Sequence, residues 1–393
     1  EKLGHKVWLW TYPNKYGTLA LPGIPNFSMH AWGEFYRQRK DMIFGGFAEC
    51  ETDRWFYNHL NQYVFGRVMW DNAADPDALI REYLERMFGG GEVSRRMGAV
   101  VDGLERKWME EVVGNYVDTP VGPKCIVPDD ETLWTKVYSP EYIASVAADL
   151  AAAKAAVPQA AADRDLVLAR IDLYDREIYR PLKEASDAYL SRQRAIAGQR
   201  KLRAGEDIAF VPFTANLGGV IGGKPKLGTE SDVRSTARMW KTDRDLCVRF
   251  DCAEPRMDDI CAIVRERNHK FLWQDNNVEF FFSPSGSRKS GYHVIVNSEG
   301  SIATLPWVAK GQSATEGKAW NPEIRTDIRK EKDRWTCEIA VPLSSIGPIA
   351  PSMPVNFCRS RILKTPGTYH QLFISSPLAR KFWDSDGYAV IEL

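Results

Sequence analysis

The stretch from Trp273 to Phe282, WQDNNVEFFF, joins a polar loop to a strand signal. Large apolar side chains occupy every second position of its second half, at Val278, Phe280 and Phe282. Side chains two apart on a strand share one face, so this alternation predicts a strand of a β-rich domain. The loop leaves Trp273 at its edge and places Glu279 on the strand that follows.

Short alternating strands continue on both sides of this stretch. We predict them at residues 208–213, 233–241, 246–250, 292–296 and 335–341. Strands of this length, separated by turns, are typical of an antiparallel sandwich. The sequence therefore predicts a β-sandwich over residues 205–393, with the domain boundary near residues 199–206.

Residues 73–200 carry helical signals instead. Asp75 and Ser139 each precede a proline, as N-caps before a proline at the first helical position do. Further along, Ile171, Tyr174 and Ile178 recur at helical spacing. We predict a helical domain over residues 73–200, whose apolar stripes are explained by core packing.

Residues 1–72 alternate between strand and helix. Apolar strands are predicted at residues 6–10 and 42–47, with helices at about 30–40 and 53–70. Two such units imply parallel strands, but two strands alone cannot form a parallel sheet with both faces covered. We interpret this segment as the end of a larger barrel or sheet. The predicted fold class is α+β multidomain: a C-terminal remnant of a (β/α)8 barrel, an α-helical bundle and an antiparallel β-sandwich.

Composition narrows the classes of partner. The chain has 393 residues, with 52 basic and 52 acidic side chains, and this balance argues against nucleic acid or an anionic membrane as a general partner. No apolar run approaches the roughly 18 residues of a transmembrane helix. Seven cysteines without a CxxC pair argue against a zinc site. Because the sequence starts at Glu1, we expect any signal peptide to have been removed or to lie outside it.

The 13 tryptophans suggest a ligand class. Core packing explains most of them. A few are expected to form platforms for sugar rings, because a pyranose face presents polarised C–H groups to an aromatic face, while its hydroxyls need polar partners nearby.

Acidic residues follow the second predicted strand of the N-terminal segment. Phe47, Glu49 and Glu51 should share one face of that strand. In a barrel, Glu49 and Glu51 would lie at the carboxyl-terminal mouth, where they could act as acid, base or nucleophile in glycoside hydrolysis or hold sugar hydroxyls. The alternative is two solvated carboxylates in a loop. His30 and Trp32 could line the same mouth or serve the structure.

The N-terminal half resembles the end of the domain of unknown function 4838 family. The resemblance covers roughly residues 1–190 and is carried by Trp55, Leu60–Val64, Val68–Asp71, Asp75–Leu79 and Phe88-Gly89. It implies a glycoside-hydrolase-like (β/α)8 barrel followed by a helical tail, with Tyr12, Glu49 and Glu51 at a sugar-binding mouth. Earlier barrel strands would belong to the missing N-terminal part of the same protein.

Residues 205–393 are similar to family 9 carbohydrate-binding modules. The similarity is carried by Trp273–Phe281, the hairpin 236–248, the strand 335–342 and the segment from Asn356 to Arg359. It implies that Trp273 stacks on a terminal sugar and that Glu279 accepts hydroxyl hydrogen bonds. The family has a second tryptophan that completes a sandwich around the sugar, and Trp383 is the nearest candidate for it here. Arg359 is included among the predicted substrate-binding residues. Ile295 stands where the family has a basic or amide residue.

Together these features predict a secreted or periplasmic bacterial protein that binds oligosaccharide or polysaccharide. It would be part of a glycoside-hydrolase-like enzyme with an appended carbohydrate-binding module. The alternatives are a non-catalytic glycan-binding protein, or a sandwich that is purely structural. No cofactor is expected, although a structural calcium ion is possible, with Asp251, Asp258 and Asp275 available.

Overall fold

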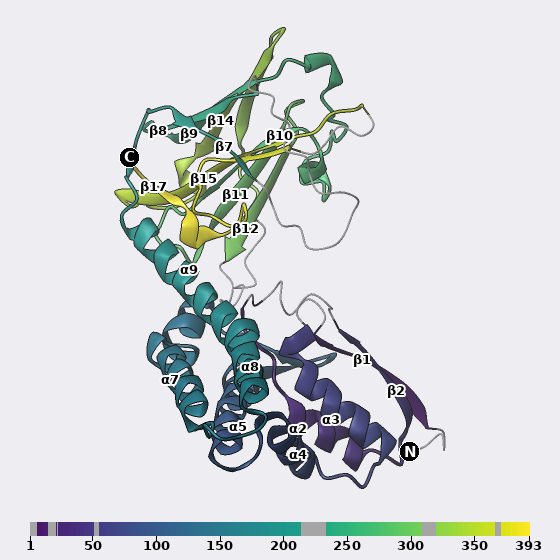
Figure 1. The fold of residues 1–393 in the computed structure, drawn as a ribbon. Helices are drawn as coiled ribbons and strands as arrows, with labels where there is room; N and C mark the ends of the chain where they lie inside the picture. Colours follow the sequence, from purple (N-terminus) through teal and green to yellow (C-terminus); the bar gives the residue numbers. More distant parts are fainter. Residues whose placement is uncertain are drawn as a thin grey trace. The chain divides into compact units, whose positions relative to one another are not determined.

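The computed structural model describes residues 6–14, 21, 23–50, 55–213, 233–308, 320–365 and 371–393. The chain forms two compact units, Glu1–Ser191 (unit 1) and Arg192–Leu393 (unit 2), which we describe separately (Figure 1). In unit 1, one cluster of buried apolar side chains extends from Leu21 to Tyr189. The segments predicted as separate domains at residues 1–72 and 73–200 therefore contribute to a common core.

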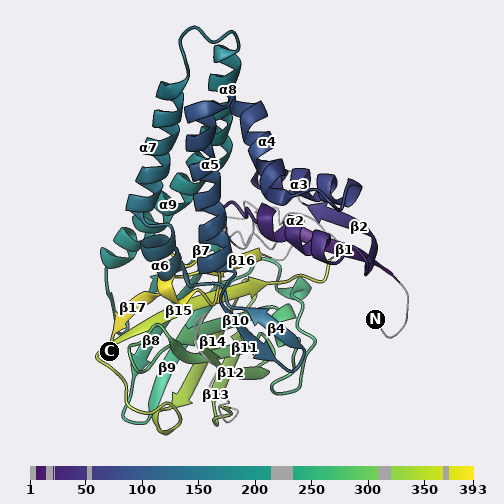
Figure 2. The same ribbon diagram turned by 90° about the horizontal axis from the view of Figure 1, so that it is seen from below.

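Unit 1 combines a two-stranded parallel sheet (β1 and β2), a short antiparallel hairpin (β3 and β4) and a group of helices (Figure 2). Its strands are β1 (Val7–Asn14), β2 (Ile43–Cys50), β3 (Tyr116–Thr119) and β4 (Gly122–Cys125). Its helices are α2 (Met29–Gln38), α3 (His59–Trp70), α4 (Pro76–Phe88), α5 (Gly91–Arg106), α6 (Asp130–Thr132), α7 (Pro140–Ala156) and α8 (Arg164–Tyr174). Helix α9 (Arg180–Ala197) starts in unit 1 and continues into unit 2.

The ends of the helices follow local sequence signals. The Asp75 carboxylate accepts a hydrogen bond from the Ala78 backbone N–H at 3.2 Å, and α4 ends at Gly89, whose φ of 78° favours glycine. Ser139 Oγ similarly accepts from the Tyr142 N–H at the start of α7. The predicted helix starts at Asp75 and Ser139 are therefore confirmed.

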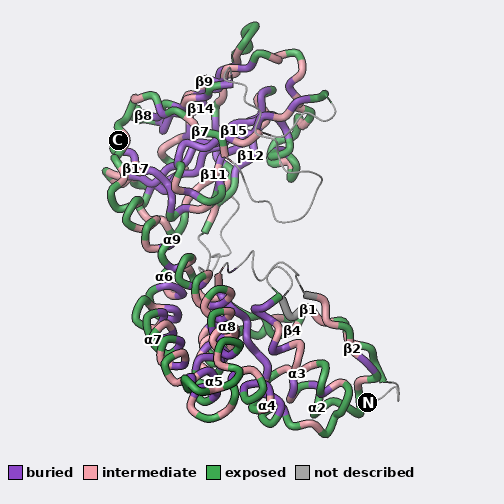
Figure 3. Tube along the Cα trace, in the orientation of Figure 1, coloured by how far each residue is buried: buried purple, intermediate pink, exposed green. Residues whose placement is uncertain are grey.

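Strands β1 and β2 pair in parallel, as predicted. One face of the pair packs against the helices, since Leu9 and Ile43 contact the core of unit 1. The other face carries the exposed rings of Trp8, Trp10 and Phe44, and Figure 3 shows this part of the chain as largely unburied. No third strand pairs with β1 or β2 within the described residues, and none of the sheets they form is closed. The predicted barrel remnant is thus not shown.

Unit 2 is a β-sandwich built from two sheets (Figure 1). The larger sheet has the strand order β12-β11-β10-β15-β16-β7, with β17 beside β15 and β5 beside β17. Its strands are β5 (Leu202–Arg203), β7 (Val211–Phe213), β10 (Asn277–Phe282), β11 (Ser290–Asn297), β12 (Ile302–Val308), β15 (Ser352–Arg361), β16 (Gln371–Ile374) and β17 (Ala389–Glu392). All pairs are antiparallel except β17 with β5.

The smaller sheet has the order β13-β14-β9-β8-β6, with every pair antiparallel. Its strands are β6 (Ile208–Ala209), β8 (Ser235–Lys241), β9 (Asp245–Ala253), β13 (Arg325–Lys330) and β14 (Arg334–Pro342). Figure 3 shows the strands of the sandwich as its most buried part. The α+β class and most of the predicted strands are confirmed, whereas residues 208–213 form two short strands, β6 and β7, in different sheets.

The faces of the larger sheet follow the alternation read from the sequence. Val278, Phe280 and Phe282 point into the core between the sheets, where they join Phe357 and the fully buried Trp335. The residues between them, Glu279 and Phe281, lie on the opposite face, which we call the outer face of the larger sheet. Among the described residues, no helix has the length and apolar character that crossing a membrane requires.

Candidate functional site

A row of side chains crosses the outer face of the larger sheet at Glu279. The ladder partners of Glu279 are Ile295 on β11 and Cys358 on β15. Beyond them, Ala303 on β12 pairs with Ile295, and Ile374 on β16 pairs with Cys358. Residues opposite one another in a ladder share a face, so Glu279 is a lone carboxylate in the middle of an apolar row.

Glu279 has one hydrogen-bonding side chain beside it. His293 Nε2 lies 2.7 Å from Glu279 Oε2, and the imidazole stacks on Phe281 with a centroid distance of 3.8 Å. Within the described part of the chain, no hydrogen bond reaches the other oxygen, Oε1. Burial and then the charge of Glu279 raise the pKa of the Cys358 thiol well above its ordinary value, so Cys358 is neutral there. Because no hydrogen bond from the described residues reaches Oε1, this oxygen of Glu279 can accept a hydrogen bond from a ligand hydroxyl.

Trp273 lies on one side of this row. It belongs to a short 3-10 turn, Leu272–Gln274, which is held because Asn277 Nδ2 donates to the Trp273 carbonyl at 3.2 Å. Leu272 is buried and packs on Ile295 and Ala303. The neighbouring Trp273 side chain is 48% exposed. The turn thus fixes its backbone through Leu272 and leaves the indole in solvent.

Trp383 lies on the other side of the same row. Its neighbour Phe382 is buried in a cluster with Cys358, Ile374 and Phe281 on the outer face. Trp383 itself is 63% exposed. The segments that carry the two exposed indoles therefore pack on opposite sides of Glu279, one over the β11 side and one over the β15 side.

The strand spacing gives the scale of this arrangement. Neighbouring strands lie about 4.8 Å apart, so Ile295 and Cys358, two strands apart, are separated by about 10 Å. A flat ring that contacts an aromatic plane on each side needs carbon–carbon distances of about 3.5–4 Å to each. The spacing of about 10 Å describes the sheet positions on either side of Glu279, whose carboxylate offers an oxygen to ligand hydroxyls.

Arg359 has a different environment from the other candidates. It is fully buried on the inner face, where Nη2 donates to Glu254 Oε2 at 2.9 Å and Nη1 donates to Ser235 Oγ and the Ala253 carbonyl. The alternation of β15 turns Arg359 to the face opposite Cys358. Its hydrogen bonds are made within the core, so we leave it out of the site.

Two of the three aspartates considered for calcium, Asp275 and Asp251, have separate partners. Asp275 accepts hydrogen bonds from the Ile263 and Val264 N–H groups and from Asn297 Nδ2. Asp251 pairs with Arg334. Across the described ranges, no group of three or more His, Cys, Asp or Glu side chains has the geometry to hold a metal ion.

In unit 1, Glu49 lies near the carboxyl-terminal end of β2. Trp10 Nε1 donates to Glu49 Oε2 at 3.1 Å. The Tyr12 backbone belongs to β1, whereas Glu51 lies outside the described residues. The structure thus brings Glu49 next to an exposed indole, and the pairing with Glu51 stays a prediction.

His30 and Trp32 lie on α2 and contact neighbouring helices. Glu105 accepts from the His30 backbone N–H at 2.9 Å and also contacts the His30 ring at Nδ1. The hydrogen bond to Glu105 raises the pKa of His30 above its ordinary value, although burial opposes it. Trp32 packs edge-on against Phe65 at 5.5 Å. Both residues thus have structural partners.

His293 is not among the site residues that the sequence predicts. Ile295, which stands where the family has a basic or amide residue, is the ladder partner of Glu279. His293 stands two residues earlier on the same face and reaches Glu279 diagonally. The period of two around Ile295 could have indicated it.

Comparison with known proteins gives likenesses only among solved structures. No protein-family model and no curated protein matches the sequence. A family 9 carbohydrate-binding module of Caldicellulosiruptor kristjanssonii in complex with glucose is 14% identical, with a TM-score of 0.30, over 42% of this chain and 78% of that one. The same organism's module with cellotriose is 12% identical, with a TM-score of 0.33, over 49% and 93%.

A Bacteroides uniformis protein described as carbohydrate-binding is 18% identical, with a TM-score of 0.34, over 47% of this chain and 85% of that one. These structures are similar to about half of the chain. Because their TM-scores are all below 0.5, we base no part of the site on them.

Proposed function

We propose that unit 2 binds carbohydrate, with one sugar ring between the indoles of Trp273 and Trp383 and its hydroxyls on Glu279. The observation that supports this proposal is that the segments carrying the exposed Trp273 and Trp383 pack, through Leu272 and Phe382, on either side of the row that contains the 5% exposed Glu279. Aromatic faces suit the C–H face of a sugar, and a charged acceptor gives strong hydrogen bonds to hydroxyls.

The chemistry of Glu279 favours a neutral hydroxylated ligand. A carboxylate accepts hydrogen bonds and repels anions, so phosphate and acidic sugars are disfavoured at this position. An indole on each side would add apolar contacts with the two faces of the sugar ring, and it would contribute little to the binding of charged groups. A neutral sugar of an oligosaccharide or polysaccharide fits these requirements, and an extracellular location is consistent with such a ligand.

Calorimetric titration of the whole chain tests this proposal. Glucose and cellotriose are suitable first probes, followed by a glycan array that covers other neutral sugars. We expect binding that Trp273→Ala weakens at least tenfold, because a central aromatic contact contributes at least about 1.4 kcal/mol. Trp335 is buried in the core, so the matched control is the exposed Trp70→Ala in unit 1, which should leave affinity unchanged.

Absence of binding to every glycan of the array would contradict the proposal and favour a purely structural sandwich. Equal affinity of Trp273→Ala and the wild type would also contradict it, because the sugar would then be bound elsewhere.

As a second function, we propose glycoside hydrolysis centred on Glu49 in a longer form of the protein. The observation that favours it is the Trp10 indole N–H on the Glu49 carboxylate at the end of a parallel strand. Turnover of chromogenic glycosides should fall by orders of magnitude in Glu49→Gln or Glu51→Gln. Equal turnover in both variants would remove these glutamates from the mechanism.

A further inference from the structure

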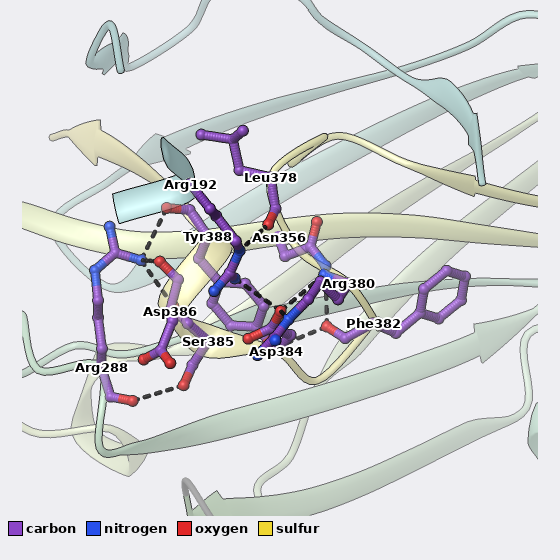
Figure 4. Close-up of polar contacts among 10 residues, drawn as sticks. All are labelled: Arg192, Arg288, Asn356, Leu378, Arg380, Phe382, Asp384, Ser385, Asp386 and Tyr388. Atoms are coloured by element: carbon purple, nitrogen blue, oxygen red, sulfur yellow. Dashed lines mark hydrogen bonds and ion pairs between the residues drawn. The ribbon is translucent and has the colours of Figure 1, made fainter. Parts of the chain in front are cut away.

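The segment that carries Trp383 is held by Arg192 and Arg288 from other parts of unit 2 and by Arg380 within the segment itself (Figure 4). Arg192 on α9 donates from Nε to the Leu378 carbonyl at 2.9 Å and from Nη2 to Asp384 Oδ2 at 2.8 Å. Asp384 Oδ2 also accepts from the Arg380 N–H at 2.8 Å and from Arg380 Nε at 3.2 Å. We call these contacts the Asp384 clasp.

A second set of contacts fixes the chain after Asp384. Arg288 Nη1 donates to the carbonyls of Ser385, Asp386 and Tyr388 at 2.7, 2.9 and 2.9 Å (Figure 4). In return, Ser385 Oγ donates to the Arg288 carbonyl at 2.7 Å. A side chain with three backbone acceptors leaves the segment little freedom to rearrange.

The residue before Trp383 is fixed as well. The Phe382 carbonyl accepts from Asn356 Nδ2 at 2.9 Å and from the Tyr388 hydroxyl at 2.8 Å (Figure 4). Trp383 therefore stands between two residues that are held by the rest of unit 2, while its own indole is 63% exposed. An exposed aromatic ring on a backbone with this many fixed contacts is preorganised for a ligand, because little backbone ordering remains for the binding step.

We infer that Arg192 is a positioning residue for the sugar site, acting through Asp384 and Leu378 to hold Trp383 in its binding position. This inference rests on the proposed function. The Arg192 and Asp384 side chains are 12% and 11% exposed, so solvent screens their ion pair far less than a surface pair. Arg192 lies before residue 205, outside the span predicted for the sandwich, so the working site includes part of α9.

The test combines binding with a probe of Trp383 itself. The whole chain is labelled with 5-fluorotryptophan, and Trp383→Phe assigns the Trp383 fluorine signal. In Arg192→Gln we expect that signal to shift or broaden and cellotriose affinity, or that of the best array glycan, to fall about three- to tenfold, the cost of ordering a large side chain on binding. Arg192→Lys keeps the charge but cannot reach both acceptors, so it should be intermediate.

A matched control and a double-mutant cycle isolate the role of Arg192. Arg238 forms an exposed pair with Asp207 in the same unit, so Arg238→Gln should change neither readout. If Arg192 acts through Trp383, Arg192→Gln should have no further effect on affinity in a Trp383→Ala background. An additive loss of affinity in that background would overturn the inference.

Failure of the proposed function gives a different result. If the wild type binds no sugar, the proposed function fails and the fluorine signal alone decides the positioning role. An unchanged Trp383 signal in Arg192→Gln, in a variant that unfolds cooperatively, would overturn the inference in either case.

Discussion

Unit 2 contains two buried carboxylates with different surroundings: Glu254 lies beside the inner face of the larger sheet, and Glu279 lies on its outer face. Glu254, beside the inner face, accepts four hydrogen bonds, from Arg359, from Arg361 at two nitrogens and from the Arg256 N–H. Glu279, on the outer face, has His293 as its hydrogen-bonding partner. A carboxylate whose acceptor capacity is filled by the protein stabilises the fold, whereas one with capacity left over can bind a ligand.

The side chains around the two carboxylates also differ in their exposure to solvent. Glu254, Arg359 and Arg361 are almost completely buried, with no large exposed side chain among them. Glu279 is nearly as buried, yet the segments beside its row carry the exposed Trp273 and Trp383. Burial alone therefore does not distinguish a structural carboxylate from a functional one. The two kinds of carboxylate are distinguished by the number of hydrogen-bond donors that the protein supplies and by the exposure of the neighbouring side chains.

The largest effect is expected at Glu254. Glu254→Gln leaves the buried guanidinium groups of Arg359 and Arg361 without a counter-charge, which should lower the free energy of unfolding by about 3–5 kcal/mol. Urea unfolding of the whole chain measures this loss in the transition of unit 2. A loss below about 1 kcal/mol would show that Glu254 does not stabilise the fold in the way that this comparison requires.

The same substitution at Glu279 should act on binding instead. Glu279→Gln removes a charged acceptor, worth about 1.5–3 kcal/mol, so sugar affinity should fall roughly 10- to 150-fold. The free energy of unfolding should change by less than about 1 kcal/mol, because Gln keeps an acceptor for His293. Destabilisation as large as that of Glu254→Gln would remove the distinction between the two sites.

A smaller effect is expected at His293. His293→Leu removes the hydrogen bond that orients Glu279, and we expect a three- to tenfold loss of affinity, about 1 kcal/mol. His293→Gln retains a donor and should recover part of the affinity. Identical affinities for His293→Leu and the wild type would show that Glu279 does not depend on His293.

The smallest effect concerns pH. Burial alone would raise the pKa of Glu254, but the hydrogen bond from Arg361 and the charges of Arg359 and Arg361 outweigh it, so the pKa is lowered. A lowered folded-state pKa contributes stability that is complete above the unfolded-state value of about 4.3 and is lost as the pH falls through the folded-state value.

Unit 2 should therefore lose stability in acid below about pH 4.3, more steeply in the wild type than in Glu254→Gln. Urea unfolding between pH 6 and pH 3 measures both slopes. Parallel slopes would indicate that other carboxylates govern the acid response.

The sequence predicts what depends on local pattern. The alternation at Val278, Phe280 and Phe282 is sufficient to assign a strand, and the caps at Asp75 and Ser139 are sufficient to start helices. It does not predict partners far along the chain. The resemblance at Asn356–Arg359 predicts a ligand contact for Arg359, but its core partner Glu254 stands 105 positions away, and only the sheet register brings the two together.

The contacts around Trp383 also join residues that are far apart in the sequence. Its support comes from Arg192, which stands 192 positions before Asp384 on a helix, and no local spacing indicates that contact. Likewise, the two parallel strands of unit 1 were predicted correctly, but the barrel inferred from them depends on strands that the described residues do not contain. Long-range pairing therefore limits prediction in both units.

The central claim is that a sugar ring binds between two indoles over a partly unsatisfied carboxylate. A crystal structure of the chain with a bound oligosaccharide tests it most directly. The account predicts one ring between Trp273 and Trp383, with a hydroxyl within about 3 Å of Glu279 Oε1. A sugar bound away from Glu279, or touching neither indole, would contradict it.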